Sequence, residues 1–238
     1  MGKGGTGVSA IPSLTAAVPA PVERPTTIYL NDQEWLTVQT TPVHLDDWVV
    51  GYLCGEGMIA QADQISRVVT DEDRGLVWVD LPEVPASTPL AFQPVGRGPL
   101  VSEPQLLRWM GEMLQNAPLY RATGGMHVAM AVRADTGQRF IREDIGRHNA
   151  VDKVLGAARR ARWPAEQAVV LTSGRISYEM CTRLARFGAT LGVSRTAATD
   201  QAYDLAMALG IDLVGYVRNT SSLIVYTEGS RVARRIEA

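Results

Sequence analysis

The chain has 238 residues, 46% of them hydrophobic, so it can bury a core as one main domain with a smaller lobe. A formal net charge of −2 provides no general basic field, so we expect neither nucleic acid nor a membrane surface as a partner, and any anion site must be local. No apolar run approaches the roughly eighteen residues that would span a bilayer.

The N-terminal segment and the two cysteines indicate where the protein works. Residues 1–25 are rich in Gly, Ala, Pro and Ser and lack the basic-then-apolar order of a signal peptide, which predicts a mobile tail. Cys54 and Cys181 lie far apart and form no Cys-x-x-Cys, a usage typical of a reducing compartment, where burial as small apolar residues is their ordinary role. We therefore expect a cytoplasmic protein.

A smaller α+β portion is predicted over residues 26–103. Apolar residues at helical spacing from Leu45 to Leu53, followed by Gly55, predict one amphipathic helix. Six prolines in the segment 82–104 predict a long loop without regular structure. The predicted strands are 26–30 and 34–40, which form a hairpin around Asn31-Asp32, followed by 66–70 and 75–81.

An α/β core is predicted over residues 104–238. Pro104 suits the first position of a helix whose buried face runs from Leu106 to Leu114. From Gln167 onward a pattern of strand, loop and helix repeats, which is the alternation of an α/β sheet. The predicted strands are 168–171, 190–193 and 213–217, the helices are 178–187, capped by Ser177, and 201–209, capped by Thr199, and a closing hairpin pairs 223–227 with 231–236.

A predicted hairpin within the core carries His127. From Gly125 to Arg133 residues alternate, so His127 shares one face of a strand with alanines, while methionines and valines occupy the other. A turn at 134–137 and a return strand at 138–142 complete the hairpin. His127 follows Thr123-Gly124-Gly125, where the glycines let a backbone approach a ligand closely. The alternative is a structural histidine that donates to a backbone carbonyl.

A helix is predicted directly after this hairpin, with Asp144 as its N-cap. Arg147 and His148 then lie in the first turn, where free N–H groups and the helix dipole favour an anion and a guanidinium adds a planar, charged fork. Glu143 and Asp144 are either a solvated acid and a cap or a pair of hydrogen-bond acceptors for a base or a sugar.

Polar residues also follow two predicted parallel strands, at the edge of the sheet where ligands of such folds bind. Thr172-Ser173-Gly174-Arg175 follow one strand, and Ser194-Arg195-Thr196 follow the next. Helix capping explains any single hydroxyl, so the prediction rests on two arginines at equivalent strand-to-helix junctions. Together with Arg147 they predict a rim that suits a phosphate or a pyrophosphate.

A metal centre or a nucleophilic triad is not indicated. Three histidines and two distant cysteines offer no ligand pair at zinc spacing. His127 with His148 would need a third ligand that the sequence does not identify.

Five long stretches together form a recognisable set. They read TIYLNDQEWLTVQTTPVHLDDWVVGYLCGEGMI, TGGMHVA, REDIGRHNAVDKVLG, LTSGRISYEM and GVSRTAATDQAYDLAMALGIDLVGYVR. In this order they resemble the motifs of the FdhD/NarQ family, the formate dehydrogenase accessory sulfurtransferases, over about residues 25 to 230.

The resemblance implies a cytoplasmic homodimer with a mixed-sheet, cytidine-deaminase-like α/β core that lacks the deaminase zinc. Members of the family transfer sulfur from a cysteine desulfurase to the molybdenum or tungsten cofactor, so that formate dehydrogenase or a related molybdoenzyme becomes active. The implied ligand is molybdenum bis(molybdopterin guanine dinucleotide), with GDP or GMP as a fragment of it. The nucleotide-contacting positions implied by the motifs are Thr123, Gly124, Gly125, His127, Asp144, Arg147, His148, Ser173, Gly174, Arg175, Ser194 and Arg195.

One departure from the family pattern bears on activity. The family carries its sulfur on a Cys-x-x-Cys in the loop that here spans 92–104, and this loop contains no cysteine. A persulfide carrier needs an exposed, nucleophilic thiolate. The first hypothesis is therefore an accessory protein that binds the cofactor, with sulfur transfer as the family activity. The alternative is a non-catalytic cofactor-binding or chaperone homologue, and a third hypothesis moves sulfur transfer to Cys54 or Cys181.

Overall fold

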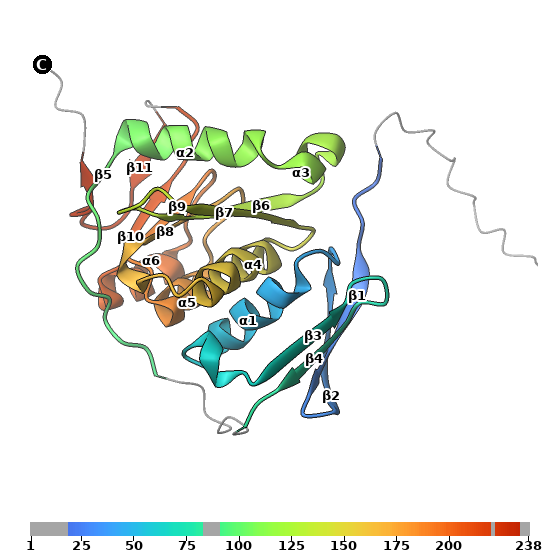
Figure 1. Cartoon of the computed structure of the whole chain (residues 1–238). Coiled ribbons are helices and arrows are strands. Elements are labelled where there is room, and N and C mark those ends of the chain that lie inside the picture. Colours follow the sequence, from blue (N-terminus) through green and yellow to red (C-terminus); the bar gives the residue numbers. More distant parts are fainter. Residues whose placement is uncertain (1–18, 83–90, 220–221, 234–238) are drawn as a thin grey trace, which may run out of the picture.

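A mixed sheet forms the centre of the computed structural model, which describes residues 19–82, 91–219 and 222–233 (Figure 1). Its strand order is β11-β10-β9-β8-β6-β7. The middle strands β8, β9 and β10 run parallel, whereas β6, β7 and β11 run antiparallel to the neighbours with which they pair. The bounds are β6 His127–Arg133, β7 Arg139–Asp144, β8 Ala168–Thr172, β9 Leu191–Ser194, β10 Asp212–Gly215 and β11 Ile224–Val225.

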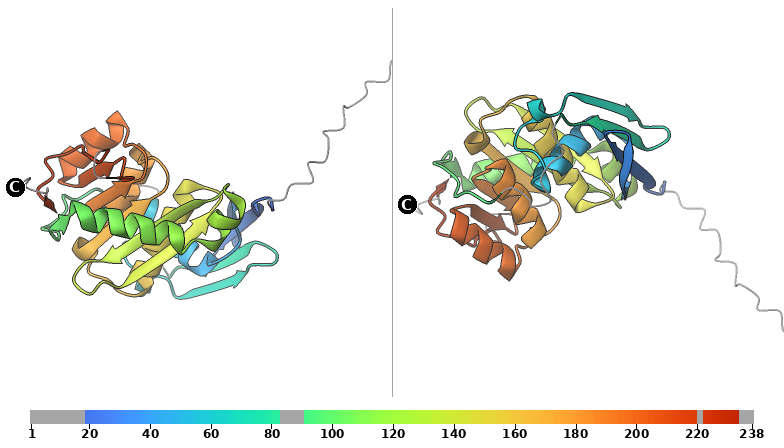
Figure 2. Two further views of the ribbon diagram at one scale, coloured as in Figure 1. Left: turned by 90° about the horizontal axis from the view of Figure 1, so that it is seen from above. Right: turned by 90° about the horizontal axis from the view of Figure 1, so that it is seen from below.

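Different helices cover the two faces of this sheet, as the alternation in β6 predicts. Ala129 and Ala131 pack in the core cluster beneath α4, α5 and α6, whereas Val128 and Met130 pack beneath α2. Figure 2 shows α2 lying across one face and α5 and α6 on the opposite side. The helices are α2 Glu103–Gln115, α3 Pro118–Thr123, α4 Arg147–Arg160, α5 Tyr178–Phe187 and α6 Asp200–Leu209, with a 3-10 turn, η2, at Ala165–Gln167.

A second sheet, ordered β2-β1-β4-β3, forms the N-terminal portion. β1 and β2 make the predicted hairpin, and both turn residues, Asn31 and Asp32, adopt the positive φ that these residue types tolerate. The predicted fold class, an α/β core on a mixed sheet with a smaller α+β portion, is therefore confirmed. The elements are β1 Arg24–Leu30, β2 Gln33–Thr40, α1 Leu45–Gly55, η1 Ala62–Gln64, β3 Arg67–Asp71 and β4 Leu76–Asp80.

Helix α1 joins the two portions by crossing α4 at very short range. A β-carbon at Gly51 would lie 1.8 Å from the carbonyl oxygen of Asp152, and one at Gly156 would lie 1.8 Å from that of Asp47. Because these contacts are with backbone atoms, no side-chain movement could relieve them. Glycine at both positions is what lets the two helices pack together.

Two predicted features of the core are wrong. Asp144 does not cap α4: it is the last residue of β7, and the N-cap is Gly146. The closing hairpin does not form, because β11 pairs with β10, and β12 (Val232–Ala233) pairs in parallel with β5 (Val101–Ser102). The reason is that the Asp212 carboxylate accepts hydrogen bonds from Thr227, Gly229 and Arg231, which turns the chain away from β11. Residues 234–236 of that predicted hairpin lie outside the described part of the chain.

The described part of the proline-rich segment follows the surface of the core as an extended chain. Residues 91–100 lie along the core without helix or strand, fixed by hydrogen bonds from Val95 N to Leu209 O at 2.9 Å and from Arg231 to Gly96 O at 2.8 Å (Figure 1). Residues 83–90 of the predicted loop and residues 1–18 of the predicted tail lie outside the described ranges. The tail prediction extends too far, since β1 begins at Arg24.

Candidate functional site

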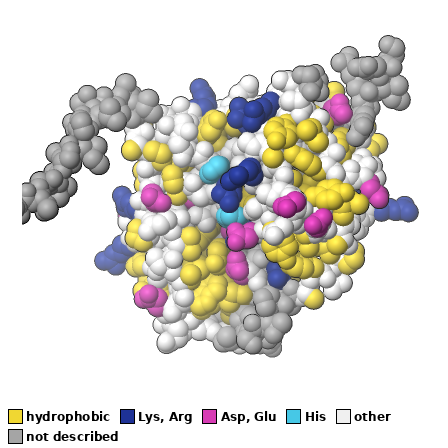
Figure 3. All heavy atoms as spheres, turned by 180° about the vertical axis from the view of Figure 1, so that it is seen from behind, with side chains coloured by type: hydrophobic (Ala, Val, Ile, Leu, Met, Phe, Trp, Pro, Cys, Tyr) yellow, Lys and Arg dark blue, Asp and Glu magenta, His cyan; other side chains and the backbone are white. Residues whose placement is uncertain are grey.

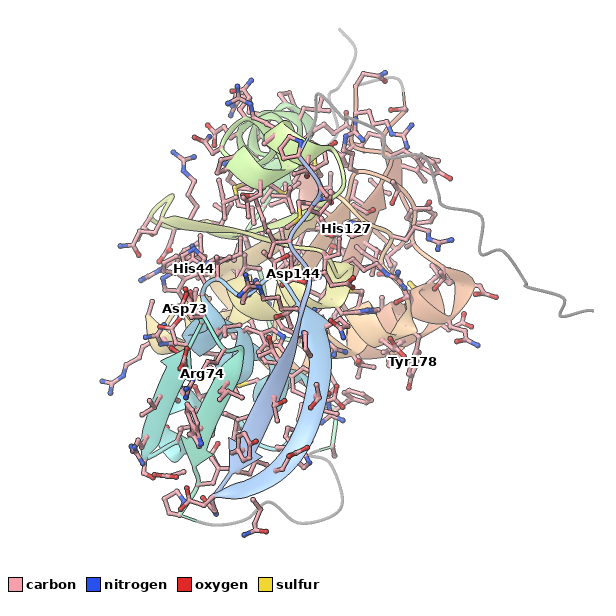
Figure 4. All side chains as sticks on the ribbon, turned by 90° about the vertical axis from the view of Figure 1, so that its right-hand side faces the viewer. His44, Asp73, Arg74, His127, Asp144 and Tyr178 are labelled. Carbon is pink, nitrogen blue, oxygen red and sulfur yellow. The ribbon has the colours of Figure 1, made fainter. Side chains whose placement is uncertain are left out.

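The start of β6, the end of β8 and the start of α4 meet at one edge of the central sheet. His127 Nδ1 lies 3.3 Å from Ser173 Oγ, and the same hydroxyl accepts the backbone N–H of Val128 at 3.0 Å. His127 and Asp144 are register partners at the ends of β6 and β7, and Figure 4 shows both on this side of the molecule. His127, Ser173 and Asp144 therefore lie close together at the start of the hairpin.

Gly174 is what allows the rim to close around His127 and Arg147. A β-carbon at this position would lie 3.1 Å from Cβ of Arg147 and 3.3 Å from Nδ1 of His127. Both distances are tighter than ordinary van der Waals contact, so any larger residue would displace one of the two side chains. The groups that approach Gly174 most closely are therefore side chains of the protein itself.

Arg147 carries an unused hydrogen-bond donor. Its Nε atom is buried and has no hydrogen-bond partner in the described part of the chain. A buried, unpaired donor of a charged group costs free energy. Burial, and then the neighbouring Arg147 guanidinium, lowers the pKa of His127, so this imidazole is neutral at pH 7 and keeps one donor and one acceptor nitrogen. Together these two side chains present donors to an anion.

His148 faces the first turn of α5. Its Nε2 lies 3.2 Å from Glu179 and 3.5 Å from the Ser177 hydroxyl. Burial and then Arg183 lower the pKa of His148 to about 4, so at neutral pH the imidazole is uncharged and its contact with Glu179 is not an ion pair. Figure 3 shows two histidine side chains on either side of a basic side chain, with acidic side chains beside them.

The two junction arginines also lie without partners. Arg175 is exposed and Arg195 half-buried, and neither side chain forms a hydrogen bond or ion pair with any described residue. Ser194, in contrast, is fully buried and donates to the carbonyl of Gly174 at 2.7 Å, while it accepts the N–H of Thr196 at 2.9 Å. Its hydroxyl therefore ties the two strand-end loops together.

The two carboxylates before α4 are occupied by the protein itself. Glu143 accepts the backbone N–H groups of Leu119 and Tyr120 at the start of α3. Asp144 is 0% exposed, and one of its oxygens accepts from Gly146 N, while the other accepts from Lys153 Nζ at 2.7 Å. In this arrangement both acids hold the backbone around the rim.

Three residues that the sequence did not single out complete this support. Lys153 also donates to the carbonyl of Thr41 at 2.8 Å, and Thr41 N donates to Asp144 at 3.0 Å. Asn149 donates to Asp144 at 3.0 Å and to the carbonyl of Gln39 at 2.9 Å. The end of β2 is thereby fixed to the turn that carries Arg147. No local pattern identifies such residues, since their partners lie more than a hundred positions away.

The Thr123-Gly124-Gly125 segment ends α3 beside the rim. Gly124 has the left-handed φ of +65° that a glycine C-cap adopts, and the Thr123 hydroxyl donates to Leu119 O. A β-carbon at Gly125 would lie 2.6 Å from the ring of Pro21, so the segment before β1 passes directly over this glycine. The structure therefore places these residues next to His127, with Gly124 and Gly125 exposed.

Neither cysteine has the environment of a sulfur carrier. Cys54 is 3% exposed and Cys181 is 0% exposed. Burial raises the pKa of the Cys54 thiol to about 11 and that of Cys181 to about 12, so both are protonated at neutral pH. Within the described residues no group of three or more His, Cys, Asp or Glu side chains is placed to hold a metal ion. None of the described helices is long and apolar enough to cross a membrane.

Comparison with known proteins gives the family. A sequence model described as the FdhD/NarQ family matches residues 21–91 and 90–233. The chain belongs to the FdhD/NarQ family. Two relatives named sulfur carrier protein FdhD are 33% identical in Geobacillus kaustophilus and 32% identical in Bacillus subtilis, over 89% and 88% of each chain, respectively.

A solved structure supports the fold of this FdhD-family chain. The crystal structure of a protein from Desulfotalea psychrophila, assigned as a formate dehydrogenase accessory protein, matches with a TM-score of 0.78 and 29% identity over 90% of both chains. The FdhD/NarQ resemblance read from the motifs is thus confirmed at the level of the whole chain.

Proposed function

We propose that this chain is a formate dehydrogenase accessory protein that binds the guanine-dinucleotide form of the molybdenum cofactor at the rim. The observation that supports it best is the buried Nε of Arg147, which has no partner among the described residues; the side chains of Arg175 and Arg195, at the neighbouring strand ends, likewise have none there. Guanidinium groups bind phosphate oxygens through parallel, charge-assisted hydrogen bonds. The diphosphate of the cofactor is the group that these donors suit.

The residues of the chain have separate parts in this proposal. The arginines bind the diphosphate, and neutral His127 donates a hydrogen bond without competing for a proton at pH 7. The Asp144–Lys153 pair holds the turn in place. The bound cofactor would supply the metal and sulfur chemistry of the client enzyme, a formate dehydrogenase or a related molybdoenzyme.

We infer that this chain does not carry sulfur on its own cysteines. The relatives bear the name sulfur carrier protein, yet both thiols here are buried and protonated, and the segment that holds the family's cysteine pair contains none. A cysteine desulfurase as a partner, a homodimeric assembly and a cytoplasmic setting, all implied by the family resemblance, complete the proposal.

Calorimetric titration with GDP and with GMP tests whether the rim binds the guanine nucleotide of the cofactor. GDP should bind more tightly than GMP, and Arg147→Ala, Arg175→Ala and Arg195→Ala should each weaken GDP binding by about 1.5–3 kcal/mol, the scale of a hydrogen bond to a charged group. Arg67→Ala, which removes an exposed arginine of β3, serves as the matched control. Unchanged GDP affinity in all three rim variants would refute the site.

Intact-protein mass spectrometry tests separately whether either cysteine of this chain accepts sulfur. The protein is incubated with a cysteine desulfurase and cysteine, with and without reductant, beside an acceptor protein that proves the desulfurase active. We expect no reductant-sensitive gain of one sulfur atom. A gain that maps to Cys54 or Cys181 would show that sulfur transfer has moved to a new position.

A further inference from the structure

A cavity of about 650 Å³ lies at the other end of α4 from the rim, between η1, the last turn of α4 and η2. Because α4 has 14 residues, the two ends are separated by about 20 Å. Three arginines of the sequence Arg159-Arg160-Ala161-Arg162 line the cavity, together with Trp163. The proposed cofactor site makes no use of them.

Arg159 forms the buried part of this cavity and has no negative partner. It is 8% exposed, and its guanidinium donates to the neutral oxygens of Gln61 and Phe187. The guanidinium carbon also lies 4.4 Å from the centroid of the Phe187 ring. Its Nε atom has no oxygen or nitrogen partner in the described ranges, where its further neighbour is the neutral Cys54 thiol and no carboxylate lies within ion-pair distance. A buried charge without a counter-charge costs free energy that an anion would offset.

Arg162 stands where a helix normally has glycine. The N–H of Arg162 donates to Arg159 O, and that of Trp163 donates to Ala158 O, the hydrogen bonds of a Schellman C-terminus. Its φ of +54° is left-handed, a conformation that costs a non-glycine residue free energy. The side chain is exposed and forms no hydrogen bond or ion pair with any described residue. The side chain of Arg162 is therefore free to contact a ligand in the cavity that it lines.

The charged side chains that line the cavity are three arginines and two carboxylates. Arg160 is neutralised by Asp46 and Asp47. The lining carboxylates Asp63 and Glu166 are exposed, where water screens them. The carbonyls of Ala157, Ala158 and Arg159 near the end of α4 accept hydrogen bonds from Ala161, Trp163 and Arg162, so these three oxygens are already occupied.

We propose that this cavity is a second ligand site, which takes a small molecule bearing a phosphate or carboxylate group, with Arg159 and Arg162 as its anion-binding residues. Its volume falls in the range of small-molecule sites, about 300–1,000 Å³. The proposal is independent of the cofactor site, because the two sites share no side chain.

The test uses the full chain with Arg147→Ala, Arg175→Ala and Arg195→Ala, which removes the three arginines proposed to bind the diphosphate at the rim. Titration calorimetry at low ionic strength with pyrophosphate and with citrate should detect one site per chain. Whichever of the two compounds binds more tightly shows whether the site prefers phosphate or carboxylate. Adding Arg159→Gln or Arg162→Gly should weaken binding at least about tenfold, the effect of losing one charged hydrogen bond. Glu166→Gln, which removes a screened negative charge, should tighten it.

Arg162→Gly also separates loss of binding from loss of folding. Since glycine adopts a left-handed φ without strain, this variant should melt at a higher temperature than the parent while binding pyrophosphate more weakly. With the rim intact, Arg162→Gly should leave GDP affinity unchanged. Failure of pyrophosphate and citrate to bind the rim variant, or equal affinity with and without Arg162→Gly, would overturn the second site and leave the cofactor site untouched.

Discussion

Lys153 donates to the carboxylate of Asp144 at 2.7 Å, and both side chains are 0% exposed. The pair lies between β7, α4 and the end of β2, since Lys153 also donates to the carbonyls of Thr41 and Glu143. A charge pair that is completely buried and hydrogen-bonded on all sides fixes the geometry of the backbone around it. Here that backbone is the turn from which Arg147 projects.

Lys153→Met should destabilise the fold strongly. The substitution preserves the volume of the side chain but leaves Asp144 buried without its counter-charge, which costs about 3–5 kcal/mol. Urea unfolding followed by circular dichroism measures the change. The matched control is Arg67→Met, which breaks the exposed pair with Asp80 and should cost less than about 1 kcal/mol. If both substitutions lower the free energy of unfolding equally, the buried pair stabilises the fold no more than an exposed pair does.

The glycines at the α1–α4 crossing should not tolerate a methyl group. Gly51→Ala and Gly156→Ala would each place a β-carbon 1.8 Å from a backbone oxygen, so we expect a loss of about 3 kcal/mol or more in unfolding free energy. Gly111→Ala on α2 meets nothing within 4 Å and should instead stabilise the protein by about 1 kcal/mol. Thermal and urea unfolding of the three variants provide the comparison.

Gly174→Ala should weaken GDP binding while leaving the fold intact. The added β-carbon would meet Arg147 at 3.1 Å and His127 at 3.3 Å, so those side chains must shift by a few tenths of an ångström. Loss of one well-placed charged hydrogen bond corresponds to about tenfold weaker binding. Gly96→Ala, where nothing lies within 4 Å, is the control. Wild-type GDP affinity in Gly174→Ala would mean that neither side chain contacts the ligand.

Acid should destabilise the protein through His148. Its pKa falls from 6.5 to about 4 in the folded state, so the unfolded chain binds the proton first, and stability is lost as the pH falls from 6.5 towards 4. His148→Gln should remove this contribution and flatten the decline. Asp152, whose pKa burial raises to about 6, acts in the opposite direction, but it is present in both proteins. Urea midpoints at pH 7, 6 and 5 test the prediction, and parallel curves would contradict it.

Both thiols should resist alkylation until the protein unfolds. Cys54 and Cys181 are buried, and burial raises the pKa values of their thiols to about 11 and about 12. At pH 8 the thiolate that reacts with iodoacetamide is therefore scarce as well as shielded. Mass spectrometry should show no adduct in buffer and two in urea. Rapid labelling of either cysteine in the native protein would reopen the possibility of a persulfide.

Where the contacts are local, residue spacing alone predicted the elements. The helix at 178–187 begins and ends where predicted, and Thr199 caps α6 through its hydroxyl as expected. The alternation in β6 predicted which side chains face each helix layer, because adjacent residues of a strand must point to opposite faces. The motif set was sufficient to recognise the family.

Tertiary structure decided what happens at charged side chains. Asp144 looked like a helix cap, but Thr41 and Lys153 take its carboxylate, and Thr41 lies 103 residues away. The sequence predicted that Arg147, Arg175 and Arg195 lie near one another at the rim. It did not predict that Ser194 is buried beneath the rim, where its hydroxyl donates to the carbonyl of Gly174. The burial of both cysteines was likewise a matter of packing. A charge or a thiol in a sequence has no environment of its own; its solvation and its partners exist only once distant segments meet.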